Sequence, residues 1–569
     1  MPYNLLVKIE SSYSRMANSL LFVGPLAALA VSPMTNFDPI NLIKLLCITT
    51  IAFFVFGLLV SSFKHSYIRI ELAFWVAVGI FILAMISTFL FSGAPITQQF
   101  WGSFGRNTGF LTYFSLLIIL VGTAIVQKID FYRGLVNSLV ITAIPMTFYC
   151  LIQIAKLDPI GWSEKYPFGT LGNINFSSGF FGLTSIAGTI LLLEKKISRA
   201  LRFGIGSMVL ADLLIVYSTG SIQGLMSFVA AIGVVGYLFL RSNVRLKLIK
   251  IPYVAFALIG FSGTLMGLVN KGPLASFIYA PSVVFRGDYM HAGWAMTWSH
   301  PFFGVGLDSY GDWYRSARGL ISTTRNNPER IANTAHNIFL DISSNGGIPM
   351  ITGYLLLLFF AVRAVMRVLN RDKVFRPYFV ALFATWFGYQ IQSLISINQV
   401  GVGIWGWLFT GAIIGYEICT RNTVVDSLTE SKNVRKKKNK QNISTLSAGA
   451  GVISFATMAL GFTLSFIPLN ADMAYKKALQ TGDLIKVMDS VKVVGSSAFH
   501  SEMALQGALK GNYLDQAKVI TDRILEKYPR DFMAWRSRAF IGNPSPEVRA
   551  GAVAKLHELD PFNPEIPKS

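Results

Sequence analysis

Charged residues are scarce in this chain of 569 residues, since Asp, Glu, Lys and Arg together make up only 14% of it. A soluble globular protein contains about 25% of these residues, so the composition argues against that class. Cysteine is scarcer still, with three residues that all lie inside apolar runs: Cys47, Cys150 and Cys419. Their spacing matches neither a zinc site nor a disulfide framework.

Acidic residues are few, because 29 Asp and Glu stand against 50 Lys and Arg, and the formal net charge is +21. In a soluble protein this excess would suggest nucleic acid as a partner. Here the basic residues lie mostly in short loops between apolar runs, so they indicate membrane topology, and no nucleic-acid partner is expected. Paired carboxylates and the usual His, Asp or Cys ligand spacings are also missing, so neither a metal nor a cofactor is expected.

Hydrophobic residues, in contrast, make up 53% of the chain, and the mean hydropathy is +0.51. Continuous apolar runs of about 20 residues, each long enough to cross a bilayer, recur along it. The sequence therefore predicts an all-α, polytopic transmembrane protein with about 13 spans. Their predicted limits are 17–34, 42–63, 70–93, 110–127, 136–155, 177–194, 203–218, 221–240, 251–269, 348–368, 377–397, 402–420 and 446–468. The first run lacks a cleavage site, so no cleavable signal peptide is expected.

Lys and Arg alternate between the loops. One set of loops carries Lys64, Arg69, Lys128, Arg133, Lys195, Lys196, Arg199, Arg202, Arg241, Arg245, Lys247, Lys250, Arg363, Arg367, Arg371, Lys373, Arg376 and the run at 432–440. The positive-inside rule places this set and the N-terminus in the cytoplasm. The segment of about 270–347 and the C-terminal tail are then outside. The basic loop 421–445 fits an orientation signal, and binding of anionic lipid or nucleic acid is its alternative interpretation.

The tail at 470–569 is polar and helix-forming, which divides the chain into a membrane domain, 1–469, and an extracytoplasmic helical domain. The stretch "ALKGNYLDQAKVITDRILEKYPRDFMAW" predicts helix, turn and helix, and it resembles tetratricopeptide-type repeats. Such repeats stack into a concave surface. Docking of a partner or of a glycan-bearing acceptor, and a helical cap without a binding role, are both open interpretations.

The outer segment concentrates aromatic residues and arginines. The spacing from 287 to 300 predicts a helix that Pro301 ends, with Trp294 and Trp298 on one face and His291 on another. Its aromatic rings suit interfacial anchoring or stacking on sugars. Arg286 stands just before this helix, and a guanidinium matches phosphate oxygens. Further outer arginines are Arg106, Arg315, Arg318, Arg325 and Arg330, each of which could instead snorkel or form a salt bridge.

His336 and Asn337 open the next apolar run. Histidine accepts a proton from a hydroxyl near neutral pH, although a lone histidine at a helix start is also a common structural element. Arginines and a histidine outside a membrane suit transfer from a lipid-diphosphate-linked sugar. The diphosphate leaving group needs charge stabilisation, and the acceptor hydroxyl needs a base.

Several segments, in order, resemble the O-antigen ligase/O-antigen polymerase superfamily, which includes protein O-oligosaccharyltransferases. These segments are "WGSFGRNTGFLTYFS", "PFGTLGNINFSSGFFG", "STGSIQG", "FRGDYMHAGWAMTWSHPFFGVGLDSY" and "AHNIFLDISSNGGIPM". The resemblance covers roughly residues 95–420. It implies a metal-independent glycosyltransferase of the bacterial cytoplasmic membrane that moves a glycan from undecaprenyl diphosphate to an acceptor on the outer face. The acceptor is a lipid core, a growing polysaccharide or a protein hydroxyl.

By this resemblance, His336 is the acceptor-activating base and Arg286 holds the donor diphosphate. The expected substrate-binding residues are Arg106, Asn173, Asn175, Gln223, His291, His300 and Asn337. Gln223 stands where the family's turn has a second arginine, so the sequence departs from the family there. Asn173 and Asn175 could instead serve only as caps of a tight loop.

A multispan transporter or flippase of a polysaccharide precursor is the alternative function. It predicts ionisable residues at mid-membrane and an internal repeat of spans. The chain shows no clear repeat, and Lys44 and Asp212 are its few charges within spans. A membrane scaffold with a partner-binding tail is a third interpretation.

Overall fold

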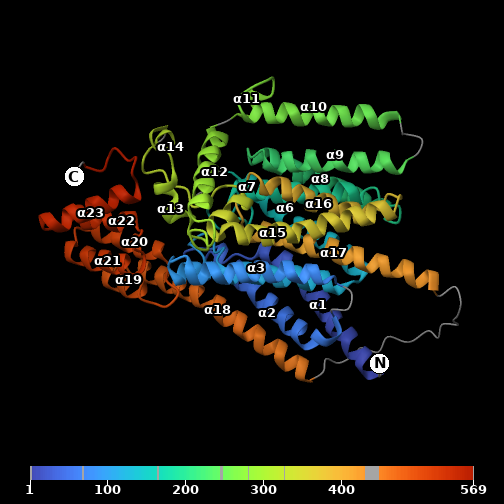
Figure 1. Cartoon of the computed structure of the whole chain (residues 1–569), viewed down its shortest axis with the longest axis horizontal. Coiled ribbons are helices and arrows are strands. Elements are labelled where there is room, and N and C mark those ends of the chain that lie inside the picture. Colours follow the sequence, from blue (N-terminus) through green and yellow to red (C-terminus); the bar gives the residue numbers. More distant parts are fainter. Residues whose placement is uncertain are drawn as a thin grey trace.

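The structure is a computed structural model that describes residues 3–66, 70–162, 166–243, 248–279, 281–325, 327–429 and 448–567. Within these ranges all regular structure is helical and no strand occurs, so the all-α prediction is confirmed. Long helices lie side by side as a bundle, and shorter helices cover one of its ends (Figure 1).

Each predicted span overlaps one long helix. These helices are α1 (Tyr3–Leu29), α2 (Asn41–Ser66), α3 (Leu72–Phe91), α5 (Phe110–Val126), α6 (Ile129–Ile154), α7 (Ile174–Leu191), α8 (Arg199–Ser218), α9 (Gln223–Ser242), α10 (Lys250–Leu268), α15 (Ile338–Arg371), α16 (Pro377–Ser393), α17 (Val400–Thr429) and α18 (Ala448–Gln480). Among the described residues, ten helices are long and apolar enough to cross a membrane. A multispan membrane protein is thus supported, and the number of about 13 spans stays a prediction.

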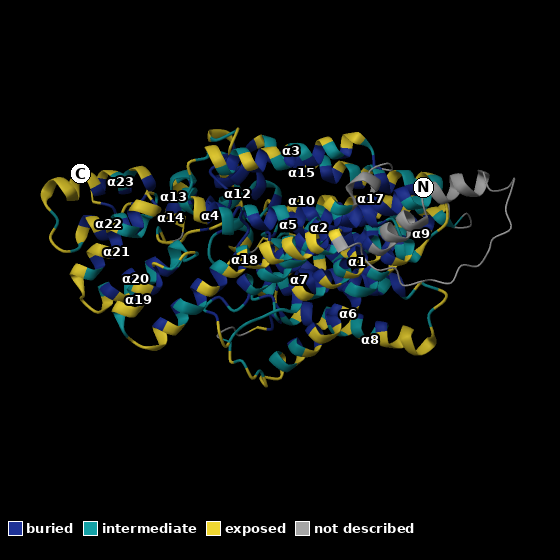
Figure 2. Cartoon of the chain, turned by 90° about the horizontal axis from the view of Figure 1, so that it is seen from below, coloured by how far each residue is buried: buried dark blue, intermediate teal, exposed yellow. Residues whose placement is uncertain are grey.

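Apolar side chains cover the outside of this bundle as well as its core. Leu72 on α3, Leu210 on α8 and Phe256 on α10 are 78%, 65% and 77% exposed. Exposed residues run along α3 and α8 (Figure 2). Apolar surface on this scale would be unfavourable in water, so lipid is its natural surrounding.

The bundle brings the starts of α7 and α9 together. A Cβ on Gly182 would lie 2.6 Å from the carbonyl oxygen of Gly224, and a Cβ on Gly224 would collide with the carbonyl oxygen of Ser178. Only glycine allows this approach. As a result, the loop before α7 and the turn before α9, which carry two of the five family-like segments, become neighbours.

A kink in α15 holds the outer loop that follows α12 (Pro281–Ser299). Gly347 interrupts α15 with φ of 72°, and Ile348 N donates to the carbonyl of Pro301 at 2.7 Å. A Cβ on Gly304 would collide with the backbone of Asn345. The glycines of "HPFFGVG" therefore fit a close approach of two backbones, which fixes the end of α12 against α15. Helix α12 also begins six residues earlier than the sequence predicts.

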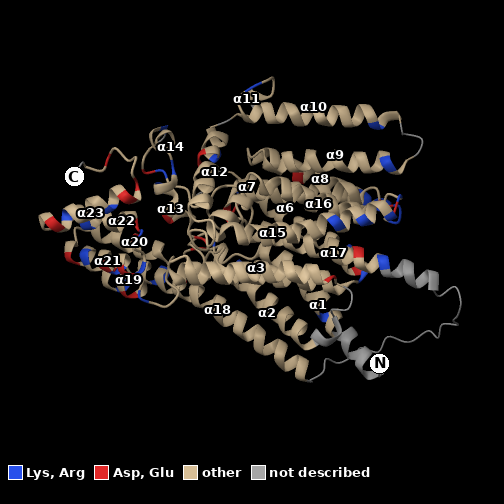
Figure 3. Cartoon of the chain, in the orientation of Figure 1, with Lys and Arg blue, Asp and Glu red and all other residues tan. Residues whose placement is uncertain are grey.

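Charges separate along the bundle. Lys and Arg mark the end that lies away from the C-terminal helices, whereas both signs occur in those helices (Figure 3). At the basic end, Arg363 and Arg367 form ion pairs with Glu71. Most of the predicted basic loop 421–445 lies outside the described residues.

The opposite end is covered by the C-terminal helical unit. It contains α19 (Leu484–Ser490), α20 (Ala498–Lys510), α21 (Leu514–Lys527), α22 (Phe532–Phe540) and α23 (Pro546–Leu559). Helix α18 leads into it and crosses the expected boundary at 469/470 without a break. Asp472 anchors this junction, because it accepts hydrogen bonds from Phe37 N at 2.6 Å and pairs with His500 Nε2 at 3.0 Å.

Candidate functional site

His336 lies immediately before α15 in a strained backbone conformation. Its φ is 52°, in the left-handed region that residues other than glycine seldom adopt. Two side chains secure the turn. Asn337 caps α15 by accepting from Phe339 N and Leu340 N at 3.0 and 3.1 Å, and Asp341 accepts from Ala335 N at 2.7 Å. This over-determined turn holds the imidazole in one direction.

The imidazole faces α12. The rings of His336 and Tyr289 lie 5.2 Å apart between centroids. Tyr289 is one helical turn beyond Arg286, so both residues lie on the same side of α12. Arg286 is half-buried. Packing of α12 on α15 thus brings together the two residues that the sequence analysis expects to be catalytic.

The surroundings of His336 strongly favour its neutral form. Burial lowers the pKa of His336 to about 3, and the positive charges of Arg286 and Arg106 add to this effect. Burial also lowers the pKa of Arg286, although an arginine remains charged at any physiological pH. A neutral imidazole has one nitrogen free to accept a proton, and it stands beside a permanent cation.

Arg106 has a different role from Arg286, because its charge is compensated. Its Nε lies 3.5 Å from Asp308, and both side chains are almost fully buried, with 5% and 3% exposed. Asp308 also accepts from Ser103 N and Thr108 N at 2.7 and 3.0 Å. The carboxylate therefore fixes both the loop that carries Arg106 and the guanidinium itself.

Most other outer arginines are also paired. Arg315 and Arg318 both bind Asp560 of the C-terminal helical unit, at 3.0 and 2.6 Å. Arg325 binds Asp288 at 2.9 Å, and the guanidinium of Arg330 lies 4.1 Å above the ring of Phe285. Of the six outer arginines, Arg286 alone has neither an acidic partner nor such a ring within the described part of the chain. Its charge is therefore the one among these six that no described side chain compensates or covers.

Three polar loops meet at the end of α16, close to His336. Asn175 accepts from Ser221 Oγ at 2.8 Å. Gln223 and Asn337 donate to consecutive carbonyls, those of Ile395 at 3.4 Å and Leu394 at 3.1 Å. The family-like segments around these residues therefore form one continuous wall.

Within this wall, Asn173 acts as the N-cap of α7 and accepts from Asn175 N at 2.8 Å. Gln223 is 1% exposed, and its Oε1 has no partner among the described residues. Its amide thus retains hydrogen-bonding capacity. Asn337, in contrast, already uses its side-chain oxygen as a cap and its nitrogen on Leu394.

The two other predicted histidines lie apart from His336. His291 is exposed on α12. The ring of His300 packs against Trp313 with centroids 4.4 Å apart, and Arg530 of the C-terminal helical unit lies 3.5 Å from the same tryptophan ring. Burial lowers the pKa of His300. A substrate-binding role for either histidine stays a prediction.

Three residues of the site were missed by the sequence analysis. Tyr289 carried a signal, since its spacing of three from Arg286 puts both on one helix face. Asp341, in the first turn of a helix capped by Asn337, carried a weaker one. The partnership of Asp308 with Arg106 joins distant segments, so no local pattern indicates it. In the ranges that the structure describes, no three His, Cys, Asp or Glu residues are grouped as a metal site requires.

Residues 207–358 match the family model described as O-antigen ligase. The matched segment contains Gln223, Arg286, His291, His300, His336 and Asn337, whereas Arg106, Asn173 and Asn175 precede it. No similar protein was found among the curated proteins.

Proposed function

We propose that this chain transfers a glycan from an undecaprenyl-diphosphate-linked donor to an acceptor hydroxyl on the outer face of the bacterial cytoplasmic membrane. The match of residues 207–358 to the O-antigen ligase family supports membership of the O-antigen ligase/polymerase superfamily, and the proposal starts from it. One observation carries this proposal: a half-buried His336, whose surroundings favour the neutral ring, stands beside Arg286, which has no acidic partner among the described residues.

In the proposed reaction, the acceptor oxygen attacks the anomeric carbon of the donor sugar. The bond from that carbon to the diphosphate oxygen breaks, and its electron pair leaves with the diphosphate. His336 takes the hydroxyl proton as general base. Arg286 stabilises the negative charge that grows on the leaving oxygen, and the reaction needs no metal in this scheme.

A base with a pKa of about 3 would be weak, and the donor itself removes this weakness. A diphosphate bound at Arg286 brings negative charge beside the imidazole and offsets the effect of the guanidinium. The pKa of His336 then rises in the donor complex, because nearby negative charge favours the imidazolium. Thus the base becomes effective only when the donor is in place.

The remaining polar residues fit supporting roles. We assign Arg106 to the electrostatics around His336, since Asp308 already neutralises it. We assign Asn175 and Gln223 to contacts with donor hydroxyls, with Asn173 holding their loop. Gln223 supplies no charge in place of the family's second arginine, so Arg286 carries the diphosphate contact in this proposal. Asn337 positions His336.

The orientation proposed for the chain follows from its charges. The basic end of the bundle faces the cytoplasm, and the C-terminal helical unit lies outside. Its successive helices pack on one another, as in tetratricopeptide-type repeats. We propose that residues 470–569, which comprise the end of α18 and the C-terminal helical unit, form a docking module. It lies beside an outer catalytic loop of about 270–347.

Transport of a precursor has less support, because the buried charges within the spans have structural partners. Lys44 donates to the carbonyls of Ala27 and Ala28 at 2.8 and 2.7 Å, at the end of α1. Asp212 accepts from the hydroxyls of Thr147 and Thr184, both at 2.6 Å. These groups join helices rather than line a path.

The test is reconstituted transfer. Purified full-length protein in detergent receives an undecaprenyl-diphosphate glycan and the native envelope fraction as acceptor, with excess EDTA. Released undecaprenyl diphosphate and the mass added to the acceptor are measured. Transfer that persists in EDTA supports the proposal. Transfer that EDTA abolishes contradicts the metal-free scheme, and movement of the donor across vesicles without bond cleavage supports a flippase.

A further inference from the structure

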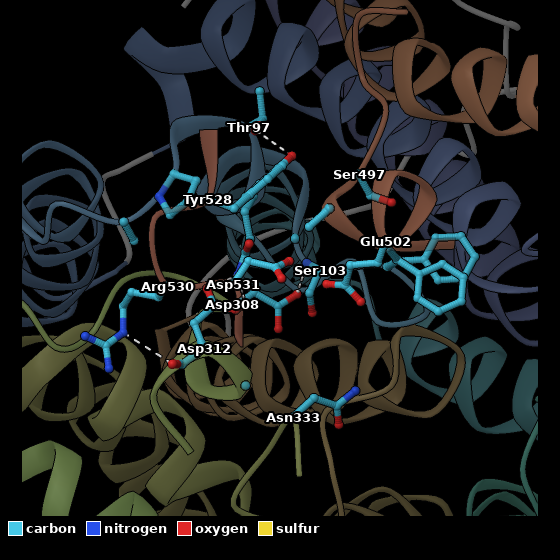
Figure 4. Close-up of a pocket in the computed structure, with 18 of the residues that line it drawn as sticks. Thr97, Ser103, Asp308, Asp312, Asn333, Ser497, Glu502, Tyr528, Arg530 and Asp531 are labelled. Carbon is cyan, nitrogen blue, oxygen red and sulfur yellow. Dashed lines mark hydrogen bonds between the residues drawn. The ribbon is translucent and has the colours of Figure 1, made fainter. Parts of the chain in front are cut away.

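A cavity of about 560 Å³ lies between the C-terminal helical unit and the outer loops of the membrane part. Ser103, Asp308 and Asp312 approach it from the outer loops, and Glu502 and Asp531 approach it from the C-terminal helical unit (Figure 4). Both parts of the chain therefore contribute polar groups to one space.

The cavity adjoins the candidate site. Asn333 lines it and accepts a hydrogen bond from Arg106 at 3.3 Å. Arg106 in turn is one of the two cations that act on His336. The Arg106–Asp308 pair thus connects the cavity, which Asp308 lines, with the imidazole of His336, on which the charge of Arg106 acts.

Carboxyl groups and arginines share the lining, and burial favours the protonated forms of three of the carboxyls, those of Asp312, Glu502 and Asp531. It raises the pKa of Asp312 to about 7. Burial, together with the neighbouring Asp531, raises the pKa of Glu502 to about 9, and a side-chain hydrogen bond joins these two carboxyls. Protonated carboxyls both donate and accept hydrogen bonds, as the hydroxyl groups of a sugar do.

Unused hydrogen-bonding atoms lie in the same lining. Asn107 is 3% exposed, and its Oδ1 has no partner in the described ranges. Ser103 is half-buried, and its Oγ also has no partner there. Buried polar atoms are normally satisfied, so these two atoms call for a polar occupant. An occupant rich in hydroxyls would satisfy them together with the carboxyls.

We propose that this cavity binds an uncharged, hydroxyl-rich segment of the glycan acceptor, so that the C-terminal helical unit selects the acceptor. This inference rests on the proposed transfer and names the acceptor class. A diphosphate is a poor occupant, because the arginines of the lining are already engaged: Arg315 and Arg536 pair with carboxylates, and Arg530 lies over the ring of Trp313. A cation is also a poor occupant, because it would have to displace protons from Asp312 and Glu502, whose pKa values burial raises.

The first test is direct binding by the full-length protein in detergent. The probes are neutral oligosaccharides released by mild acid from the host's envelope polysaccharide, with uronic-acid oligosaccharides and envelope peptides as comparison. Titration calorimetry gives the affinities. Glu502→Gln is expected to weaken binding of the neutral probes by about 3- to 10-fold, the effect of one altered hydrogen bond. Glu547→Gln is the matched control, because Glu547 is exposed on α23, and we expect it to leave binding unchanged.

A second variant tests the cavity by steric blocking, because the hydrogen bonds around Glu502 could rearrange to accommodate Glu502→Gln. Thr97 is exposed at the cavity, where its hydroxyl lies 3.5 Å from that of Tyr528, so Thr97→Trp narrows the cavity, and Thr97→Ser, which keeps the hydroxyl, is its control. Thr97→Trp is expected to abolish binding of the neutral probes. In the transfer assay, both Thr97→Trp and Glu502→Gln raise the KM for acceptor and leave the KM for donor unchanged.

Unchanged binding in both Glu502→Gln and Thr97→Trp overturns the proposal, as does preferential binding of the acidic oligosaccharides or the peptides. Failure of the proposed function has a separate outcome. Wild type would then transfer nothing, while the binding titrations would still report whether the cavity takes a neutral glycan.

Discussion

The ring of Tyr289 lies 5.2 Å from the ring of His336, and this contact joins α12 to the start of α15. Tyr289 stands one turn after Arg286, so the aromatic contact also sets how near the guanidinium comes to the imidazole. In the proposed mechanism, this pairing provides a neutral base beside a cation that binds the donor diphosphate. Our predictions follow from this pairing and from the contacts that support it.

The first prediction concerns the protonation of His336. Its folded-state pKa lies near 3, below the ordinary 6.5, so the ring is neutral throughout the range from about pH 5 to 8. Arg286→Gln removes one of the positive charges and raises this pKa toward its ordinary value. Nitrogen NMR of histidine-labelled protein measures the pKa of His336 in the wild type and in Arg286→Gln, and His336→Asn is used to assign the signal. A wild-type midpoint near 6.5 would contradict the account.

The donor reverses this effect, which is a second prediction. In the free enzyme His336 does not titrate near neutrality, so kcat/KM for donor shows no acid limb from it. In the complex, the bound diphosphate raises the pKa of His336, and kcat falls as the pH drops through the new value. The pH dependence of the rate at low donor concentration reports the free enzyme, and that at saturating donor reports the donor complex. An acid limb of equal position in both profiles argues against activation by the donor.

How far the sequence predicts such a site depends on the range of the contacts involved. The apolar runs and the loop charges identify the helices, because both are local properties of the chain. The charge partners are not local. Arg315 and Arg318 look like free outer cations in sequence, yet their partner Asp560 lies more than 240 residues away. Only the fold shows that Arg286 is the one of the six outer arginines with neither a carboxylate nor an aromatic ring as partner in the described ranges.

The same limit applies to His300. In sequence it stands in a histidine-proline segment that resembles a family motif, as His336 stands in another, and nothing in the spacing separates them. The fold turns His300 toward Trp313 and Arg530, whereas a left-handed backbone at position 336 directs His336 toward α12. Positive φ at a non-glycine residue is a tertiary constraint that no local pattern reveals.

A third prediction concerns Asp308, which holds Arg106 and the backbone of the loop at 103–108. Asp308→Ala leaves a buried guanidinium unpaired, so we expect a loss of about 3–5 kcal/mol of stability. Thermal unfolding of the detergent-solubilised protein measures it. Asp130→Ala is the matched control, because Asp130 is 94% exposed in its pair with Arg133 and such pairs contribute about 0–1 kcal/mol. Equal effects of the two changes would show that the Arg106–Asp308 pair does not stabilise the loop.

A fourth prediction concerns docking of the C-terminal helical unit. Asp560 is fully buried and receives both Arg315 and Arg318. Asp560→Ala leaves Arg318 buried without its carboxylate, and we expect the unit to detach from the outer loops while its helices remain folded. Limited proteolysis in the segment 310–330 reports this release. Glu558→Ala, at an exposed neighbouring position that pairs with Lys555, is the control. If proteolysis is the same in both variants, the contact with Asp560 does not hold the unit in place.

The measurement that tests the central claim most directly compares His336→Asn, Arg286→Gln and Arg325→Gln with wild type in the reconstituted transfer assay. Asparagine tolerates the left-handed backbone at position 336 and lacks a basic nitrogen, so His336→Asn keeps the fold and tests the base alone. We predict that it lowers kcat by about 10²- to 10⁴-fold, the typical contribution of a general base. Arg286→Gln raises the KM for donor and lowers kcat, whereas Arg325→Gln, which removes an outer arginine paired with Asp288, leaves transfer near wild type. Transfer by His336→Asn at the wild-type rate would contradict the account, because the base would then be another residue.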